Sequence, residues 1–269
     1  GKEQTLIEKI IEIVRNDKNQ VSSLDGMELI LVPAGEFPMG CARSHHGGRL
    51  CVSQELPLHT VYLDAYYIDK YEVTNAQYSL CVESEACEVP QFANSVNGSS
   101  WEYWVHPEFD SHPVVFVTWY DAQDYCKWAG RRLPTEAEWE KAARGETIKA
   151  FPWGDEIPDC SFTNFDATVF SDDESVCVGG TSRVGSYPID TSTYGVMDMG
   201  GNVSEWVNDW YSHYKETENL NPIGPVNGQE KSYRGGNWYT FYVQVAGRHS
   251  LTPDRYSGYL GFRCASSIP

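Results

Sequence analysis

The apolar residues of this chain occur in short runs, and this feature restricts the fold more than any other. Each run has the length of a β-strand and is bounded by Gly, Pro, Asn or Asp; the runs cover residues 29–32, 61–68, 114–117 and 260–264. Bounded runs of this length are typical of strands in an irregular domain. With 269 residues, 23 Gly and 13% aromatic residues, the chain can bury a substantial core without a helical bundle. The pattern predicts a loop-rich α+β fold with little regular secondary structure.

Two segments carry the signals of α-helices. Residues 119–129 place small and aromatic side chains on one face and are followed by a glycine. The second helix begins after Thr135, whose hydroxyl group is expected to cap it while Glu138 reaches back in a capping box. By contrast, residues 150–211 show no periodicity. A long irregular stretch inside a compact domain is usually functional or held by a metal or a disulfide.

We expect the first 25 residues to form a helix and a linker that precede the main domain. Residues 4–15 place apolar side chains at i, i+3, i+4 and i+7, which indicates a short amphipathic helix, and residues 19–25 have the composition of a linker. The helix either docks on the main domain or forms a stalk to an upstream segment. We expect residues 26–269 to form one domain. Because the sequence opens on Gly1 instead of Met, we expect that a native leader is missing from it.

The charge of the chain limits its partners. With 38 acidic and 20 basic residues, the formal net charge is −18, so phosphate backbones and anionic lipids are repelled. The longest apolar stretch, residues 29–34, is too short to span a membrane. We therefore expect neither nucleic-acid binding nor membrane insertion. Clustered carboxylates favour divalent cations, and calcium is the cation that takes such oxygen ligands.

The eight cysteines predict disulfides. An even number in an acidic, Trp-rich chain favours an oxidising compartment outside the cytoplasm, which means a periplasmic, secreted or surface location. Their spacing suggests three local pairs and leaves two cysteines over; the pairs are Cys41 with Cys51, Cys81 with Cys87 and Cys160 with Cys177, and the remaining two are Cys126 and Cys264. Reduced, buried cysteines are the alternative, and the sequence alone does not fix the connectivity.

Eight motifs follow one another in a fixed order. They occupy residues 32–40 (VPAGEF, then MG), 69–75 (DKYEVTN), 113–114 (PV), 131–140 (RRLPTEAEWE), 151–154 (FPWG), 200–206 (GGNVSEW), 234–238 (RGGNW) and 261–264 (GFRC). In this order they resemble the formylglycine-generating enzyme family, also called the sulfatase-modifying factors. The resemblance implies a variant of the C-type lectin fold. It also implies a disulfide between Cys126 and Cys264.

The resemblance further implies two calcium sites. In the first, Asp198 and Glu205 would supply side-chain oxygens, and the backbone carbonyls would come from Met199, Gly201 and Val203. Two carboxylates that flank a glycine turn let several carbonyls converge on one ion at about 2.3–2.6 Å. The alternative is a metal-free turn, in which Asp198 caps backbone amides and Glu205 pairs with an arginine.

The second implied calcium site is less complete. The resemblance places the side chain of Asn164 and the carbonyl of Phe165 in it. Its other ligands would come from the acidic stretch that follows, where Asp172, Asp173 and Glu174 are candidates.

The chain departs from the family where the family performs its oxidation. The oxidases of this family carry two cysteines shortly after the Gly-Gly-Ser motif, and those cysteines bind copper. Here no cysteine occurs between Val178 and Arg263, and Gly235-Gly236-Asn237 is followed by a shortened segment. Soft monovalent copper needs thiolate or thioether ligands, so we expect no copper and no catalytic residues. The alternative is an enzyme of the broader family, of an oxidoreductase or sulfatase-maturation type, that uses an unrecognised metal centre.

Aromatic residues gather in the segment that replaces the missing cysteines. The candidate ligand-binding residues are Trp238, Tyr239, Thr240, Phe241, Tyr242, His249, Tyr256 and Tyr259. Aromatic side chains provide a large contact area at a small entropic cost, although half of them, Trp238 above all, could instead belong to the core. Retroelement-diversified lectin-fold proteins carry their variable residues in the corresponding stretch, so a product of a diversity-generating retroelement is one form of this hypothesis.

The sequence therefore predicts a calcium-stabilised domain without oxidase activity. Its aromatic segment, residues 238–260, would bind a protein or a glycan. We expect the domain to act as a monomer or as part of a larger polypeptide. A purely structural module of an envelope protein or of a regulatory kinase is a third possibility.

Overall fold

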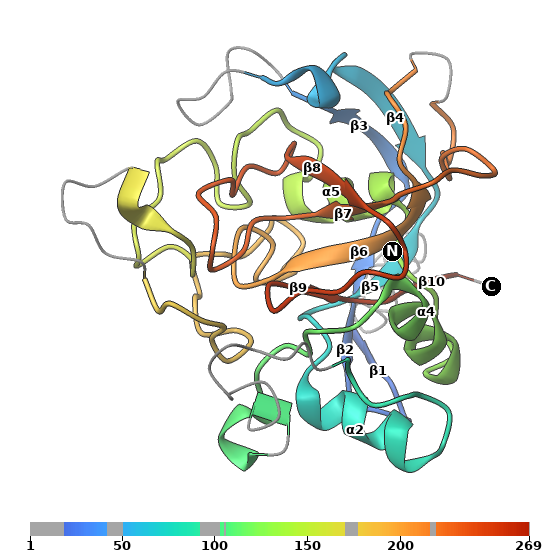
Figure 1. The fold of residues 1–269 in the computed structure, drawn as a ribbon. Helices are drawn as coiled ribbons and strands as arrows, with labels where there is room; N and C mark the ends of the chain where they lie inside the picture. The colour runs from blue at the N-terminus through green and yellow to red at the C-terminus, as the bar shows by residue number, and fades with distance from the viewer. Residues whose placement is uncertain are drawn as a thin grey trace, which may run out of the picture.

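The computed structural model describes residues 19–41, 51–91, 103–104, 106–169, 177–215 and 219–268, and its architecture is shown in Figure 1. In these residues, ten short strands form three sheets, and three α-helices pack around them. The fold is α+β and rich in loops, as predicted. Within these residues, no helix is both long and apolar enough to cross a membrane.

The first sheet joins the two ends of the described chain. Its strands lie in the order β1-β2-β5-β10 and are all antiparallel to their neighbours; they are β1 (Asn19–Val21), β2 (Glu28–Val32), β5 (Tyr66–Asp69) and β10 (Ala265–Ser267). The linker predicted over residues 19–25 is therefore wrong at its start, because Asn19–Val21 pair with β2. Their polar composition gave no local sign of this long-range pairing. The amphipathic helix predicted over residues 4–15 lies outside the described residues.

The other two sheets build the rest of the domain. One is the hairpin of β3 (Gly35–Met39) and β4 (His59–Leu63). The third has the order β8-β7-β6-β9, in which only β6 and β9 run parallel; its strands are β6 (Ser204–Trp210), β7 (Lys231–Arg234), β8 (Arg248–Leu251) and β9 (Leu260–Phe262). Because of this register, one end of the sheet brings together the end of β7 and the beginnings of β6, β8 and β9. The predicted binding segments leave the sheet at this end.

Both predicted helices are confirmed, and a third was not expected. Helix α4 spans Trp119–Trp128, and α5 spans Glu136–Arg144 behind the Thr135–Glu138 capping box. Helix α2 (Asn75–Glu83) begins at a capping box of Thr74 and Gln77. Its exposed and buried positions do not form a clear apolar stripe in the sequence, so periodicity could not reveal it. The described part of the chain also contains three short 3-10 helices: η1 (Ser53–Glu55), η2 (Pro107–Phe109) and η3 (Ala167–Val169).

Helix α5 lies at the centre of the molecule, and all nine of its residues are buried. Its acidic side chains are neutralised by arginines, in a group that we call the α5 network: Glu136, Glu140, Arg144, Arg234 and Arg248. Arg248 binds Glu136 through two hydrogen bonds of 2.7 and 2.6 Å, Arg144 binds Glu140 at 2.8 Å, and Arg234 contacts both glutamates. Buried charges require such partners, because an unpaired ion in the interior is expensive to desolvate.

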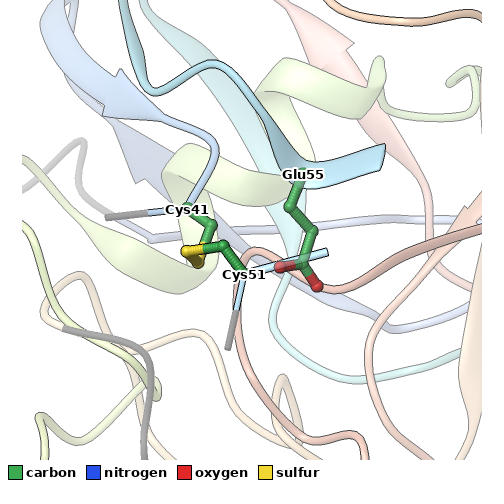
Figure 2. A group of neighbouring side chains, drawn as sticks. All are labelled: Cys41, Cys51 and Glu55. Carbon is green, nitrogen blue, oxygen red and sulfur yellow. A yellow bond between two sulfur atoms is a disulfide. The ribbon is translucent and has the colours of Figure 1, made fainter. Parts of the chain in front are cut away.

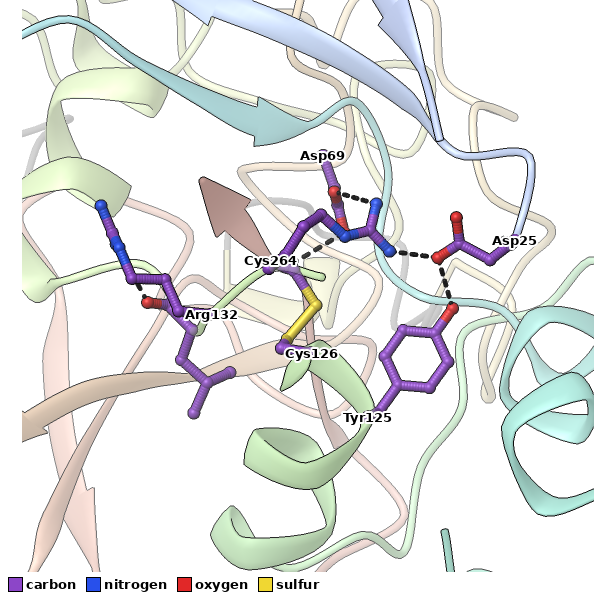
Figure 3. Close-up of a disulfide and its surroundings, with 8 residues drawn as sticks. Asp25, Asp69, Tyr125, Cys126, Arg132 and Cys264 are labelled. Atoms are coloured by element: carbon purple, nitrogen blue, oxygen red, sulfur yellow. Dashed lines mark hydrogen bonds and ion pairs between the residues drawn. A yellow bond between two sulfur atoms is a disulfide. The ribbon is translucent and has the colours of Figure 1, made fainter. Parts of the chain in front are cut away.

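All eight cysteines form disulfides, and the pairs are those expected from spacing and from the family resemblance: Cys41–Cys51, Cys81–Cys87, Cys126–Cys264 and Cys160–Cys177. Figure 3 shows the pair Cys126–Cys264 next to a buried ion cluster, in which the guanidinium of Arg131 joins Asp69 and Asp25. The backbone N–H of Cys264 donates to Asp69, and the hydroxyl of Tyr125 donates to Asp25. The disulfide and the ion cluster together fasten α4 to the first sheet.

Candidate functional site

The residues predicted to bind a ligand lie close together at one end of the third sheet. The ring of Tyr239 meets that of Trp238 edge-on, with centroids 5.6 Å apart, and lies parallel to that of Tyr259 at 6.3 Å. Phe241 stacks on Tyr242 at 4.4 Å. Tyr239 is the most exposed of the predicted residues, with 67% of its surface accessible, while the other rings are half-buried.

One residue of this surface was missed by the sequence analysis. Tyr233 of β7 stacks on His249 of β8 at 5.1 Å, and His249 in turn meets the ring of Tyr242 at 6.1 Å. Burial, reinforced by the neighbouring hydroxyl of Tyr259, raises the pKa of Tyr233 to about 12. We call these two groups of rings together the aromatic face: Tyr233, Trp238, Tyr239, Phe241, Tyr242, His249 and Tyr259. Alternation along β7 could have indicated Tyr233, because its neighbours Ser232 and Arg234 are buried.

Three of the predicted binding residues are less available for a ligand, because two of them hold the loop in place and one lies outside the ring contacts. Trp238 is half-buried and donates from its indole N–H to the carbonyl of Gly258 at 3.1 Å, so it is partly a framework residue. The hydroxyl oxygen of Thr240 accepts the backbone N–H of Tyr242 and shapes the loop. Tyr256 is half-buried and, among the described residues, joins none of these ring contacts.

The beginning of the aromatic face rests on the glycine turn at residues 198–205. The backbone N–H of Trp238 donates to the carbonyl of Asn202 at 3.0 Å, and the side-chain amide of Asn237 donates to the hydroxyl of Ser204 at 2.9 Å. Gly236 has no room for a side chain, because a Cβ there would lie 2.4 Å from the carbonyl oxygen of Gly200. The face is therefore built directly on the predicted calcium turn.

This segment contains no thiolate. The disulfides occupy every cysteine of the chain, and no free cysteine remains. Directly after Gly235-Gly236-Asn237, the chain has Trp238-Tyr239-Thr240-Phe241-Tyr242. The residues that follow the glycine turn therefore offer no thiolate, which is one of the ligands that monovalent copper takes.

The glycine turn itself is held by a buried aspartate. Asp190 accepts the backbone N–H groups of Gly200 and Gly201 at 2.9 and 3.2 Å and the hydroxyl of Thr163 at 2.5 Å. Burial, together with the charge of Asp198, raises the pKa of Asp190 to about 7. The turn also bends through left-handed backbone at Asp198, where φ is 59°.

The two carboxylates predicted to bind calcium differ in their surroundings. Asp198 is buried and accepts the backbone N–H of Gly185 at 2.6 Å, and burial raises its pKa to about 6. Glu205 accepts the indole N–H of Trp139 at 2.8 Å and two N–H groups of Arg263 at 2.7 Å each. The amide cap and the arginine pair that we set against calcium are therefore both present. The predicted carbonyl donors Met199, Gly201 and Val203 lie buried in the same turn.

A further carboxylate, which the sequence analysis missed, faces this turn. Glu72 has no exposed surface, and neither of its side-chain oxygens has a hydrogen-bond partner among the described residues. Burial, then the charge of Asp198, raises the pKa of Glu72 well above its usual value. Its place in the 69–75 motif was visible in the sequence, but its orientation toward residue 198 depends on the fold.

The second predicted calcium site also contains an unsatisfied oxygen. Asn164 is fully buried; its amide donates to the carbonyl of Gly180 at 2.8 Å, while its Oδ1 has no partner among the described residues. The carbonyl of Phe165 accepts a long hydrogen bond of 3.3 Å from Cys177. A buried, unpartnered amide oxygen is the group that a calcium ion would take. The candidates Asp172, Asp173 and Glu174 lie outside the described residues.

Among the described residues, one further cluster of metal-ligand side chains was found, and it contains a disulfide. In the described part of the chain, one set of three His, Cys, Asp or Glu residues has ligand atoms within 4.8 Å of one another, namely Cys41, Cys51 and Glu55. Figure 2 shows that the two sulfurs of this set are bonded to each other, so neither is a thiolate. His59 is half-buried, and its Nδ1 lies 2.9 Å from the carbonyl of Pro57, which agrees with a structural histidine.

Comparison with known sequences identifies the relatives of this chain. The family model described as "Sulfatase-modifying factor enzyme 1-like domain" matches residues 15–268. The formylglycine-generating enzyme of Streptomyces coelicolor is 34% identical over 88% of this chain and 88% of its own length. The serine/threonine-protein kinase Pkn1 of Chlamydia trachomatis is 35% identical over 98% of this chain. The chain spans only 42% of the length of that kinase.

Solved structures agree with this assignment. The PvdO protein of Pseudomonas aeruginosa superposes with a TM-score of 0.74 at 25% identity, and variable protein 1 of Treponema denticola with 0.70 at 22% identity. Each match covers 93% of this chain and 98% of the other. The fold is the C-type-lectin-like fold of the formylglycine-generating enzyme type. By sequence, by motif order and by fold, the chain belongs to the sulfatase-modifying factor family, which includes the formylglycine-generating enzymes.

Proposed function

We propose that this chain is a calcium-stabilised binding domain that has lost the oxidase chemistry of its family. The observation that carries this proposal is the replacement of the oxidase cysteine pair by a supported aromatic surface. All eight cysteines are used in disulfides, so no thiolate is left for copper. In the same segment, Tyr239 is exposed over rings that the sheet and the glycine turn hold in place.

The aromatic face suits the recognition of a protein or a glycan. Tyrosine and tryptophan rings lose little conformational freedom on binding and combine an apolar body with a polar tip. The similar fold of a protein named variable protein 1 supports the idea that the residues of this face vary among sibling genes, as in products of diversity-generating retroelements. Sequencing siblings from the source genome would test this part, and identical residues at 238–242 in all of them would contradict it.

Calcium is proposed at both predicted sites. The first would use oxygens of the turn from Asp198 to Glu205, and the second would use Asn164 and Phe165. The unpartnered Oδ1 of Asn164 supports the second site. Calcium would supply structural support to the turn under the aromatic face, and no chemical step is assigned to it.

We also propose a location outside the cytoplasm. Four disulfides form and persist in oxidising compartments, whereas cytosolic thiols are kept reduced. Mass measurement of the protein from its native source, without reducing agent, would test the location, and eight free thiols would contradict it.

Two measurements on the purified protein test the main proposal. A random peptide display library and a glycan array serve as probes, and we expect binders that the double variant Tyr239→Ala/Tyr259→Ala loses. Tyr120→Ala, which removes a half-exposed ring on α4, is the matched control and should keep them. Formation of an aldehyde from a cysteine-containing sulfatase peptide in the presence of copper would overturn the proposal. It would instead favour an enzyme with an unrecognised metal centre.

A further inference from the structure

A hollow with an uncovered apolar rim lies beside β10. It has a volume of about 410 Å³ and is bounded by the β4–β5 turn, the start of α5 and residues 221–223, while Ile268 closes it just after β10. Leu63 and Leu133 are buried in its wall, whereas 64% of Ile223 and 43% of Ile268 are exposed to water. The volume is that of a binding site, and none of the residues that line the hollow belongs to the aromatic face.

The charged groups of the hollow already have partners. The guanidinium of Arg132 donates to both oxygens of Glu138 at 2.6 Å. Asp64 accepts the side-chain amide of Asn221 at 2.8 Å, and its backbone N–H donates to the oxygen of that amide at 2.8 Å. A ligand that binds through charge would have to displace these bonds. The hollow therefore suits an apolar occupant that covers its rim.

The first strand of the neighbouring sheet runs away from this hollow. Asn19, the first residue of β1, pairs with Ile30 of β2. Two residues further along β2, Val32 lies in the row of Tyr66 and Ser267, and the last two line the hollow. Because β1 and β2 are antiparallel, the chain that precedes Asn19 arrives from the side of the hollow.

Two other hollows of the described chain fit the arriving segment less well. One, of about 270 Å³, is lined by Glu28 among others. It lies at the opposite end of the sheet, because Glu28 pairs with Val21, the last residue of β1. The other, of about 40 Å³, has room for no more than a few water molecules. The direction of β1 and the available volume thus both select the hollow beside β10.

The segment that precedes β1 has an apolar face of its own. Within residues 4–15, apolar side chains recur at helical spacing; they are Leu6, Ile7, Ile10, Ile11 and Val14. A helix of this length is marginal in water by itself, so it needs a surface that covers this face. As a helix the segment would span about 18 Å, and residues 16–18 would add about 10 Å when extended. Because β10 lies three strand spacings from β1, about 14 Å, the segment can reach the hollow.

We propose that residues 4–15 dock as a helix on the hollow of their own chain and cover Ile223 and Ile268. An amphipathic helix that lays its apolar face into a groove is a common mode of recognition. The N-terminal segment is then part of the domain and not a stalk to an upstream segment. The inference does not depend on the aromatic face or on calcium, so it can fail while the proposed function stands.

Photo-crosslinking in the intact chain locates the segment. Ile10→benzoylphenylalanine places the probe on the apolar face, and we expect it to form crosslinks within one chain to peptides that contain residues 221–223 or 268. Glu12→benzoylphenylalanine places the same probe on the opposite, polar face of the helix, and this control should not form them. Crosslinks between two copies, crosslinks to another part of the chain, or none from the Ile10 probe would overturn the proposal.

Limited proteolysis measures the same contact from the side of the hollow. Ile223→Glu places a charge on the rim, and we expect trypsin to cleave after Lys9 at least about tenfold faster, because undocked backbone is open to the protease. Val226→Glu is the matched control, since Val226 is 95% exposed and does not line the hollow; it should be cleaved at the wild-type rate. Equal near-ultraviolet circular dichroism of the three proteins shows that the fold is kept. Equal cleavage rates in all three would overturn the proposal.

Discussion

Two buried groups of charge differ in how they are neutralised. The α5 network contains two glutamates and three arginines, and each glutamate has at least two arginine contacts. Around the glycine turn the ratio is reversed, since one arginine faces several carboxylates; the arginine is Arg263, and the carboxylates are Glu72, Asp198 and Glu205. Both groups are inaccessible to solvent.

The two groups therefore differ in how completely the protein itself neutralises its buried charges. In the α5 network, protein groups alone meet the need for partners. At the glycine turn, protein groups leave an excess of negative charge and two orphaned oxygens. The first region should therefore respond to mutation but not to calcium, and the second should respond to both.

The largest effect is expected in the α5 network. Arg234→Met removes a fully buried guanidinium that contacts Glu136 and Glu140, and breaking a buried ion pair from one side costs about 3–5 kcal/mol. Urea unfolding, followed by tryptophan fluorescence, measures the loss. Calcium should not restore the lost stability. Recovery on adding calcium would mean that the two regions are not independent.

The next effect concerns the glycine turn. Chelation by EGTA should lower the melting temperature, because an ion present at 100 times its dissociation constant stabilises the folded state by about 2.7 kcal/mol. The expected shift is therefore several degrees, measured by scanning calorimetry. Added calcium should reverse it, whereas added magnesium in EGTA should not. An unchanged melting temperature would remove the contrast between the two regions.

A smaller effect is expected at Asp209, a buried carboxyl group beside the α5 network that is neutralised by a proton and not by a metal ion. Burial, then the charge of Glu136, raises the pKa of Asp209 to about 8, from 3.8 in the unfolded chain. The folded state thus keeps a proton that the unfolded state releases, so this group's contribution to stability falls as the pH rises from about 4 to about 8. Asp209→Asn should flatten that decline in urea titrations at pH 5, 7 and 9. Asp124→Asn, at an exposed position, should follow the wild-type curve.

The smallest effect on stability is expected at the aromatic face. Tyr239→Ala removes a ring that is two-thirds exposed, so the free energy of unfolding should change by no more than about 0.5 kcal/mol. Affinity for peptides selected on the wild-type protein should nevertheless fall at least about tenfold, as for an interface anchor. Parallel loss of stability and binding would place Tyr239 in the framework rather than in the binding surface.

Local signals in the sequence predicted much of this fold. The capping box at Thr135 and Glu138 fixed the start of α5, and short spacing indicated three of the four disulfides. The strand at Asn19–Val21 could not be predicted in this way, since its polar residues acquire β-structure only by pairing with β2. Strand pairing is a long-range property that local composition does not report.

In the candidate sites, too, some features were visible in the local sequence and others depend on long-range contacts. The aromatic residues at 238–242 were visible as a cluster in the sequence, but Tyr233 joined them only through the pairing of β7 with β8. Glu72 lies 126 positions before Asp198, and nothing in its own motif indicates a buried carboxylate without donors. Such a juxtaposition arises from the fold, so only the structure reveals it.

Gly236 limits which positions of this domain can be varied to redesign it as a binder. Any larger residue there would collide with the backbone of Gly200 and with Val243, whereas two positions further on the side chain of Trp238 already reaches the partly exposed surface. A combinatorial library that begins at residue 238 would therefore sample new specificities on an intact scaffold. One that begins two codons earlier would consist largely of misfolded clones.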